Sequence, residues 1–116
     1  MEGLTDPLEK LLAIFDALQE AVASPGYNGC AFANATAEAA PDSVEAVALR
    51  TFRKWLSDLV LGLAIEAGFA DPAAVSDRLR LLYDGAVANS QLESHPAAAR
   101  VAKEMAELVL ETSSRA

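Results

Sequence analysis

The chain has 116 residues, of which 53% are hydrophobic and 22% charged, and its formal net charge is −8. This length fits one domain over residues 1–116, and the apolar fraction is too high for a disordered chain. A chain this acidic is not expected to bind the nucleic-acid backbone directly, and its single cysteine excludes an intramolecular disulfide. Neither a signal peptide nor an apolar stretch of membrane-spanning length is present, so we expect a cytoplasmic protein.

The first two predicted elements lie in the first third of the chain. A helix is expected to begin after Asp6, whose side chain can cap exposed backbone N–H groups, with Glu9 completing the capping pattern. Apolar residues then recur at helical spacing until Ser24-Pro25-Gly26 ends the pattern. A short second helix is expected from about Cys30 to Ala39. Its alternating alanines also fit a short strand, but alanine is a poor strand former.

The longest predicted helix begins at Asp42, where Asp42 and Glu45 repeat the acidic capping pattern, and ends near Gly68. One face of this helix is apolar and is predicted to face the core; it consists of Ala48, Phe52, Trp55, Leu56, Leu59 and Leu63. The opposite face is charged and is interpreted as solvated; it carries Arg50, Arg53, Lys54 and Asp58.

The fourth predicted helix, from Pro72 to about Glu93, is apolar on two sides. One stripe consists of Val75, Leu79, Leu82, Tyr83 and Ala86, and a second consists of Leu81, Gly85, Ala88 and Leu92. The remaining polar face is narrow and contains Asp77, Arg80, Asp84 and Gln91. The fifth predicted helix, from Pro96 to about Glu111, contributes Met105 and Leu108.

Two interpretations account for the second stripe. In the first, two copies of the chain form a symmetric dimer, and the last two helices of each copy build a four-helix bundle. The dimer interface would then contain Leu81, Gly85, Ala88, Leu92, Met105 and Leu108. In the second, the stripe packs under the first helix within one monomer.

The common motifs for catalysis, metal binding and phosphate binding are not found in the sequence. His95 is the only histidine and Cys30 the only cysteine, so the common zinc ligand sets cannot be assembled, and no phosphate-binding loop is present. We therefore expect no enzyme, no metal and no cofactor. A set of aromatic side chains with one amide either lines a small-molecule pocket or fills an ordinary core: Phe15, Phe32, Asn34, Phe52, Trp55 and Tyr83.

Several segments together resemble the C-terminal domain of TetR-type transcriptional regulators. They are Gly29-Cys30-Ala31-Phe32-Ala33-Asn34-Ala35, the long helix through Trp55, Ala70-Asp71-Pro72, and Leu82-Tyr83-Asp84-Gly85-Ala86. The resemblance implies a domain that dimerises through its last two helices and binds an inducer. It also implies pocket roles for Phe32, Asn34, Phe52 and Trp55. Nothing in the sequence corresponds to the N-terminal helix-turn-helix that binds DNA in that family.

We therefore expect an all-α domain of about five helices, packed as an orthogonal or bundle arrangement. It would form a homodimer and bind a small, largely apolar effector, with no direct contact to nucleic acid or membrane. The alternative is a stand-alone dimerisation module that binds no ligand and titrates a full-length relative through mixed dimers. A small enzyme is a third hypothesis, which the residues do not support because no nucleophile, base and orienting group can be assembled.

Overall fold

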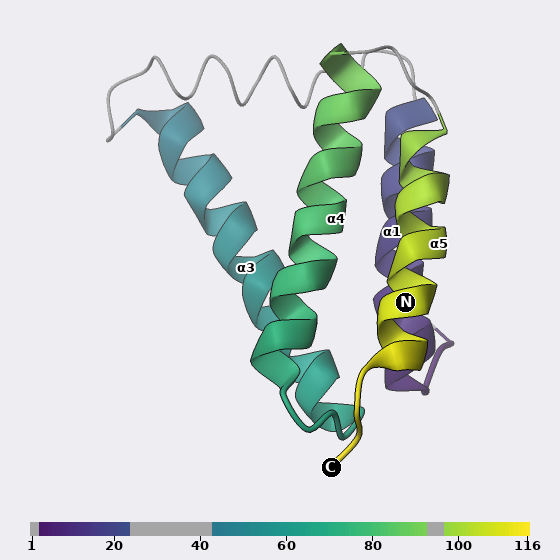
Figure 1. Ribbon diagram of the computed structural model, residues 1–116. Coiled ribbons are helices and arrows are strands. Elements are labelled where there is room, and N and C mark those ends of the chain that lie inside the picture. Colours follow the sequence, from purple (N-terminus) through teal and green to yellow (C-terminus); the bar gives the residue numbers. More distant parts are fainter. Residues whose placement is uncertain (1–2, 24–42, 93–96) are drawn as a thin grey trace.

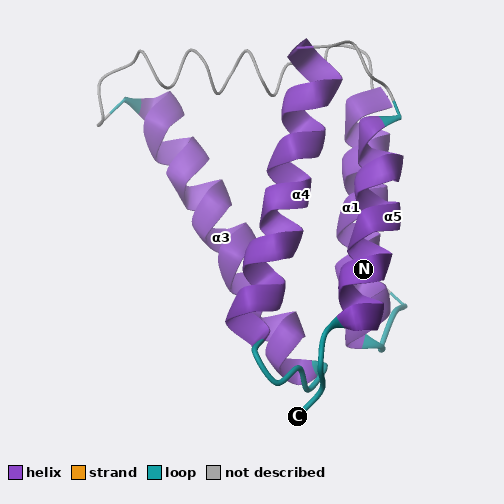
Figure 2. Cartoon of the chain, viewed as in Figure 1, coloured by secondary structure: helices purple, strands orange, loops and turns teal. Residues whose placement is uncertain are grey.

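The computed structural model describes residues 3–23, 43–92 and 97–116, apart from the side chains of residues 91 and 92. These residues form helices α1 (Pro7–Ala23), α3 (Val44–Glu66), α4 (Pro72–Leu92) and α5 (Ala98–Thr112). Figure 2 shows that every regular element in the described part is a helix, as predicted. The expected helix over residues 30–39 lies outside the described residues, so the count of five helices stays a prediction.

The starts of α1, α3 and α4 follow from short polar side chains at their caps, whereas α5 begins after Ala97 with no side-chain cap. Asp6 Oδ1 accepts a hydrogen bond from the Leu8 amide at 3.0 Å, and Asp71 Oδ1 accepts one from the Ala74 amide at 3.1 Å. At α3 the cap is Ser43, whose Oγ accepts from the Ala46 amide at 3.1 Å. The prediction of a start at Asp42 was wrong by one residue, because serine and aspartate cap equally well and only the backbone decides between them.

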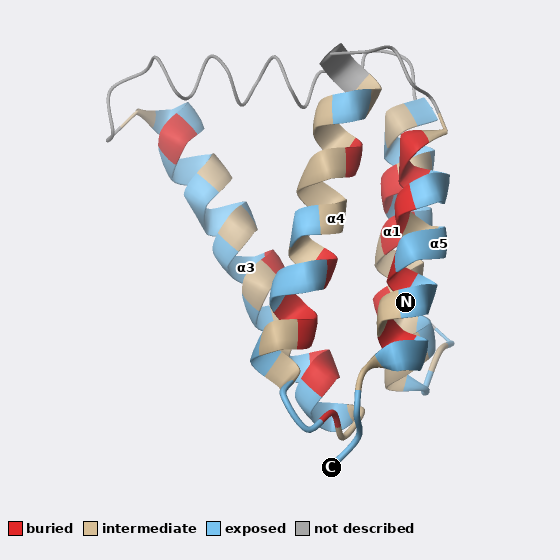
Figure 3. Ribbon diagram, viewed as in Figure 1, coloured by how far each residue is buried: buried red, intermediate tan, exposed pale blue. Residues whose placement is uncertain are grey.

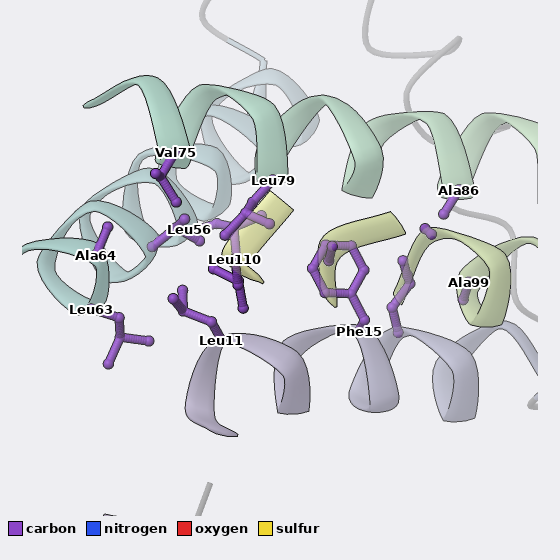
Figure 4. Close-up of a cluster of buried hydrophobic side chains, with 14 of the residues drawn as sticks. Leu11, Phe15, Leu56, Leu63, Ala64, Val75, Leu79, Ala86, Ala99 and Leu110 are labelled. Atoms are coloured by element: carbon purple, nitrogen blue, oxygen red, sulfur yellow. The ribbon is translucent and has the colours of Figure 1, made fainter. Parts of the chain in front are cut away.

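Among the described helices, α4 packs against both α3 and α5, and α1 packs mainly against α5. Figure 1 shows α4 between α3 and α5, with α1 behind α5, and α3 diverging from α4 toward the N-terminal end of α3. The core lies where α1, α4, α5 and the C-terminal half of α3 meet, as the close-up in Figure 4 shows. Its largest fully buried side chains are Leu11, Leu79 and Val75. None of the described helices combines the length and hydropathy needed to span a bilayer.

The buried face of α3 differs from the predicted one. Leu56 and Leu63 are buried as expected, but Phe52 and Trp55 are 43% and 57% exposed. The core face is completed by Val60 and Ala64 instead, which lie on the other side of Leu56 around the helix. Figure 3 shows the buried residues of α3 gathered mainly in its C-terminal half. The diverging half of α3 therefore presents aromatic side chains that the described residues do not bury.

The C-terminal residues fold back onto the connection between α3 and α4. The Ala70 amide donates to the Ser114 carbonyl at 2.9 Å, and the Ala116 amide donates to the Gly68 carbonyl at 2.7 Å. The Arg115 guanidinium lies 4.5 Å from the centroid of the buried Phe69 ring and donates to the Ala67 carbonyl at 2.8 Å. These bonds tie the end of α5 to the start of α4.

Candidate functional site

Two of the predicted pocket residues meet inside the bundle. The rings of Phe15, from α1, and Tyr83, from α4, have centroids 6.3 Å apart in an edge-to-face arrangement. They border a small cavity between α1, α3 and α4, here called the inner cavity, which is lined by Leu11, Ile14, Phe15, Leu56, Val60, Leu79, Arg80 and Tyr83. Its volume of about 10 Å³ is that of one water molecule at most, so the cavity is nearly filled by its own walls.

The other predicted pocket residues lie elsewhere or outside the description. Phe52 and Trp55 contact each other on α3, with ring centroids 5.9 Å apart, but neither lines the inner cavity. Phe32 and Asn34 lie outside the described residues. The structure thus brings together two pairs among the four predicted pocket residues that it describes, and the role of all six in binding stays a prediction.

A charged pair joins α3 to α4 beside these aromatic residues. Two nitrogens of the Arg53 guanidinium donate to the two carboxylate oxygens of Asp84, each at 2.9 Å. The hydrogen bonds to Asp84, followed by the attraction of its charge, raise the pKa of Arg53 above the ordinary arginine value, against the effect of partial burial. The sequence interpretation of Arg53 as solvated was wrong, because its side chain is half-buried in a bond between helices.

Arg80 is a residue of this region whose role the sequence did not indicate. It is half-buried and lines the inner cavity together with apolar side chains. Among the described residues it forms an ion pair with no carboxylate, in contrast to Arg53, Lys54, Arg100 and Lys103. The position of Arg80 on the helical wheel, next to Tyr83 and Val87, is the signal that could have placed it toward the interior.

The second apolar stripe of α4 faces away from the core and continues onto α5. Leu81 is 72% and Leu108 59% exposed, Met105 is exposed, and Gly85 and Ala88 are half-buried. A groove of about 270 Å³ runs between the two helices, and its walls include Leu81, Gly85, Val101 and Met105. We call these exposed side chains and the groove the α4–α5 surface. The side chain of Leu92 lies outside the described residues.

The α4–α5 surface is not covered by α1, which contradicts a monomer in which the second stripe packs beneath the first helix. The core-facing residues Val75, Leu79 and Ala86 lie on the opposite side of α4 from Leu81. On α5 the buried alanines form one side, and Val101, Met105 and Leu108 form a neighbouring stripe that is exposed. An apolar surface formed by two adjacent helices is typical of an interface.

The described part of the chain offers no chemistry for a metal centre. No group of three or more histidine, cysteine, aspartate or glutamate side chains in that part could hold an ion. Every side-chain polar atom buried in the described residues also has a hydrogen-bond partner. The features that stand out are therefore the inner cavity, the Arg53–Asp84 pair and the α4–α5 surface.

Comparison with known proteins identifies the family. The sequence profile of the family described as "Tetracyclin repressor-like, C-terminal domain" matches residues 7–106. No curated protein and no solved structure matches the chain significantly. The family profile covers α1, α3 and α4 completely and more than half of α5. The chain therefore belongs to the family of tetracycline repressor-like C-terminal domains, which are parts of transcription regulators.

Proposed function

We propose that this chain is the dimerisation and effector-binding domain of a TetR-like transcription regulator, and that contact with DNA belongs to a separate domain. The observation that carries the proposal is the α4–α5 surface. Large apolar side chains exposed side by side on neighbouring helices are costly in water, because burying each of them against a partner would gain roughly 1.5 to 3 kcal/mol. The net charge of −8 supports the proposal that this domain does not contact DNA directly, because the DNA backbone is also negatively charged.

A second copy of the chain suits this surface. The helices α4 and α5 are consecutive and antiparallel in Figure 1, so a two-fold axis would place them against the same two helices of a partner and form a four-helix bundle. Gly85 has no atom of another side chain or distant backbone within 4 Å of where a Cβ would stand. A partner helix could therefore approach α4 closely at this position.

The inner cavity is the proposed effector site. It lies where α3 begins to diverge from α4, and its lining residues are apolar except for Arg80 and Tyr83. Because its present volume is about 10 Å³, an effector would enter only if α3 and α4 moved apart. Such an effector shifts a conformational equilibrium by binding the open arrangement better than the closed one, which is how a ligand can control a linked domain.

The dimer is tested by substituting one glycine and using another as the control. Gly85→Leu is expected to convert the dimer to a helical monomer in sedimentation equilibrium, because leucine would hold the two copies of α4 apart. Gly62→Leu is the matched control, since Gly62 is also in a helix, is open to solvent and lies outside the α4–α5 surface. A Gly85→Leu variant that stays dimeric would show that the interface lies elsewhere.

A second candidate function is a dimerisation module that binds no effector. The near-filled inner cavity favours it, because a domain built to bind a ligand commonly shows a larger pocket. Native mass spectrometry of the protein as purified distinguishes the two candidates by stoichiometry and retained mass. A dimer with added small-molecule mass supports the effector-binding domain. A bare dimer, together with no binding of apolar probes, supports the module.

A further inference from the structure

We propose that the effector is an apolar anion, a mainly hydrocarbon or aromatic molecule with one acidic group, and that Arg80 binds that group. The inference rests on the proposed function, because it assigns a ligand class to the inner cavity. It goes further in naming the charge of the ligand and the side chain that selects it.

The first step is the position of Arg80. It lies on α4 between Leu79 and Tyr83, both of which also line the inner cavity, and it is half-buried. The walls opposite come from α1 and α3 and are aliphatic or aromatic. The Arg80 side chain thus lines a cavity that is otherwise mainly apolar. In such surroundings a cationic group interacts with a bound charge more strongly than it would in water, because the local dielectric constant is lower.

The second step is that the described residues provide no counter-ion for Arg80. Asp84 lies one turn after Arg80, but both of its carboxylate oxygens bind Arg53 at 2.9 Å. Among the described residues no other carboxylate pairs with Arg80. A half-buried cation without a partner costs free energy through lost hydration, and a bound carboxylate would offset that cost. Arginine is also suited to this task because its planar fork can bind both oxygens of a carboxylate.

The third step concerns the rest of the ligand. The inner cavity has its polar groups on α4 alone, whereas Leu11, Ile14 and Val60 on the other helices offer only hydrocarbon. A ligand with polar groups at both ends would leave one of them unpaired against these side chains. The ligand is therefore apolar along its length and acidic at one end.

The test compares two fluorescent probes that differ in one acidic group. The first is 1-anilinonaphthalene-8-sulfonate, an apolar anion, and the second is N-phenyl-1-naphthylamine, its analogue without the sulfonate. Arg80→Met keeps an unbranched apolar stem and removes the charge. We expect this substitution to weaken the anionic probe by at least about tenfold, the size of one charged hydrogen bond, and the uncharged probe by less than about threefold.

Two control variants locate the effect. Arg78→Met removes an exposed arginine from the same helix, outside the inner cavity, and is expected to leave both affinities unchanged. Met105→Gln alters the α4–α5 surface. Unchanged affinities of both probes for this variant would show that the probes do not bind at that surface. Circular dichroism at matched concentrations establishes that each variant is folded.

The outcomes separate the two proposals. Selective loss of the anionic probe in Arg80→Met supports the inference. The inference is overturned if each probe binds Arg80→Met as tightly as it binds the unaltered protein. It is also overturned if the substitution weakens both probes equally. Both outcomes leave effector binding in place. Failure of both probes to bind the unaltered protein overturns the inference together with the effector-binding part of the proposed function.

Discussion

Gly62 and Gly68 lie close together in sequence but have different backbone conformations. Gly62 is inside α3, whereas Gly68 follows the helix with a left-handed φ of 82°. Neither would bring an added Cβ within 4 Å of a neighbour. We expect Gly68→Ala to lower the free energy of unfolding by about 1 kcal/mol, because a Cβ is strained at positive φ. Gly62→Ala should raise it by roughly 0.5 to 1 kcal/mol, because alanine is the better helix former.

Urea denaturation followed by circular dichroism measures both glycine variants. All samples are compared at one protein concentration, because association stabilises the folded state. If the two substitutions both raise or both lower the free energy of unfolding, the result contradicts the backbone conformations assigned to the two glycines.

Phe15 and Phe52 provide a comparison of a buried and an exposed phenylalanine. Phe15 is 2% exposed and Phe52 is 43% exposed. Phe15→Ala is expected to cost about 3 to 5 kcal/mol of unfolding free energy, through lost burial and the cavity left behind. Phe52→Ala should cost less than about 1 kcal/mol. Because the first variant removes much of the stability of a small domain, Phe15→Leu is measured beside it, with an expected cost of less than about 1.5 kcal/mol.

Helices α3 and α4 are held at their point of divergence by the Arg53–Asp84 pair. A double-mutant cycle with Arg53→Ala and Asp84→Ala is expected to give a coupling of about 1 kcal/mol, the upper end for a pair that water still reaches. The Lys54–Asp58 pair within α3 is more exposed and should give only about 0.3 to 0.5 kcal/mol. Equal coupling energies would show that the bond between helices contributes no more than a local one.

The net charge of the whole molecule bears on the proposed dimer. Each copy carries a formal charge of −8, so a dimer brings two acidic chains together. We expect sedimentation equilibrium to show tighter dimerisation as sodium chloride rises from about 50 mM to about 500 mM, because salt screens the repulsion and strengthens apolar contacts. A dimer that weakens over this range would indicate an interface dominated by ion pairs.

Much of the fold could be predicted from the sequence because its signals are local. Asp6 and Asp71 act through hydrogen bonds to residues two or three positions away, so helix starts are visible in the sequence. The stripe of α4 that contains Leu81 was predicted from helical periodicity alone.

The predictions that failed depend on how the helices are placed. The apolar pattern of α3 permits two overlapping faces, and only the position of α4 selects the one with Val60 and Ala64 rather than Phe52 and Trp55. Arg53 and Asp84 are 31 residues apart, so no local pattern pairs them. The helical wheel places Arg80 next to Tyr83, but the inner cavity itself forms only where α1 and α3 pack against α4.

The bonds at the C-terminus would fix one end of α3 and α4 if these helices move apart to admit an effector. The Ser114 and Ala116 backbone groups hold the connection between α3 and α4, so this end of the helices is fixed to the end of α5. At the other end, α3 and α4 are already apart. In a small rotation about the fixed end, the displacement of each helix grows with distance from that end and is largest at the opposite end. Opening of the inner cavity would therefore be amplified along α3 while the turn at Gly68 hardly moves.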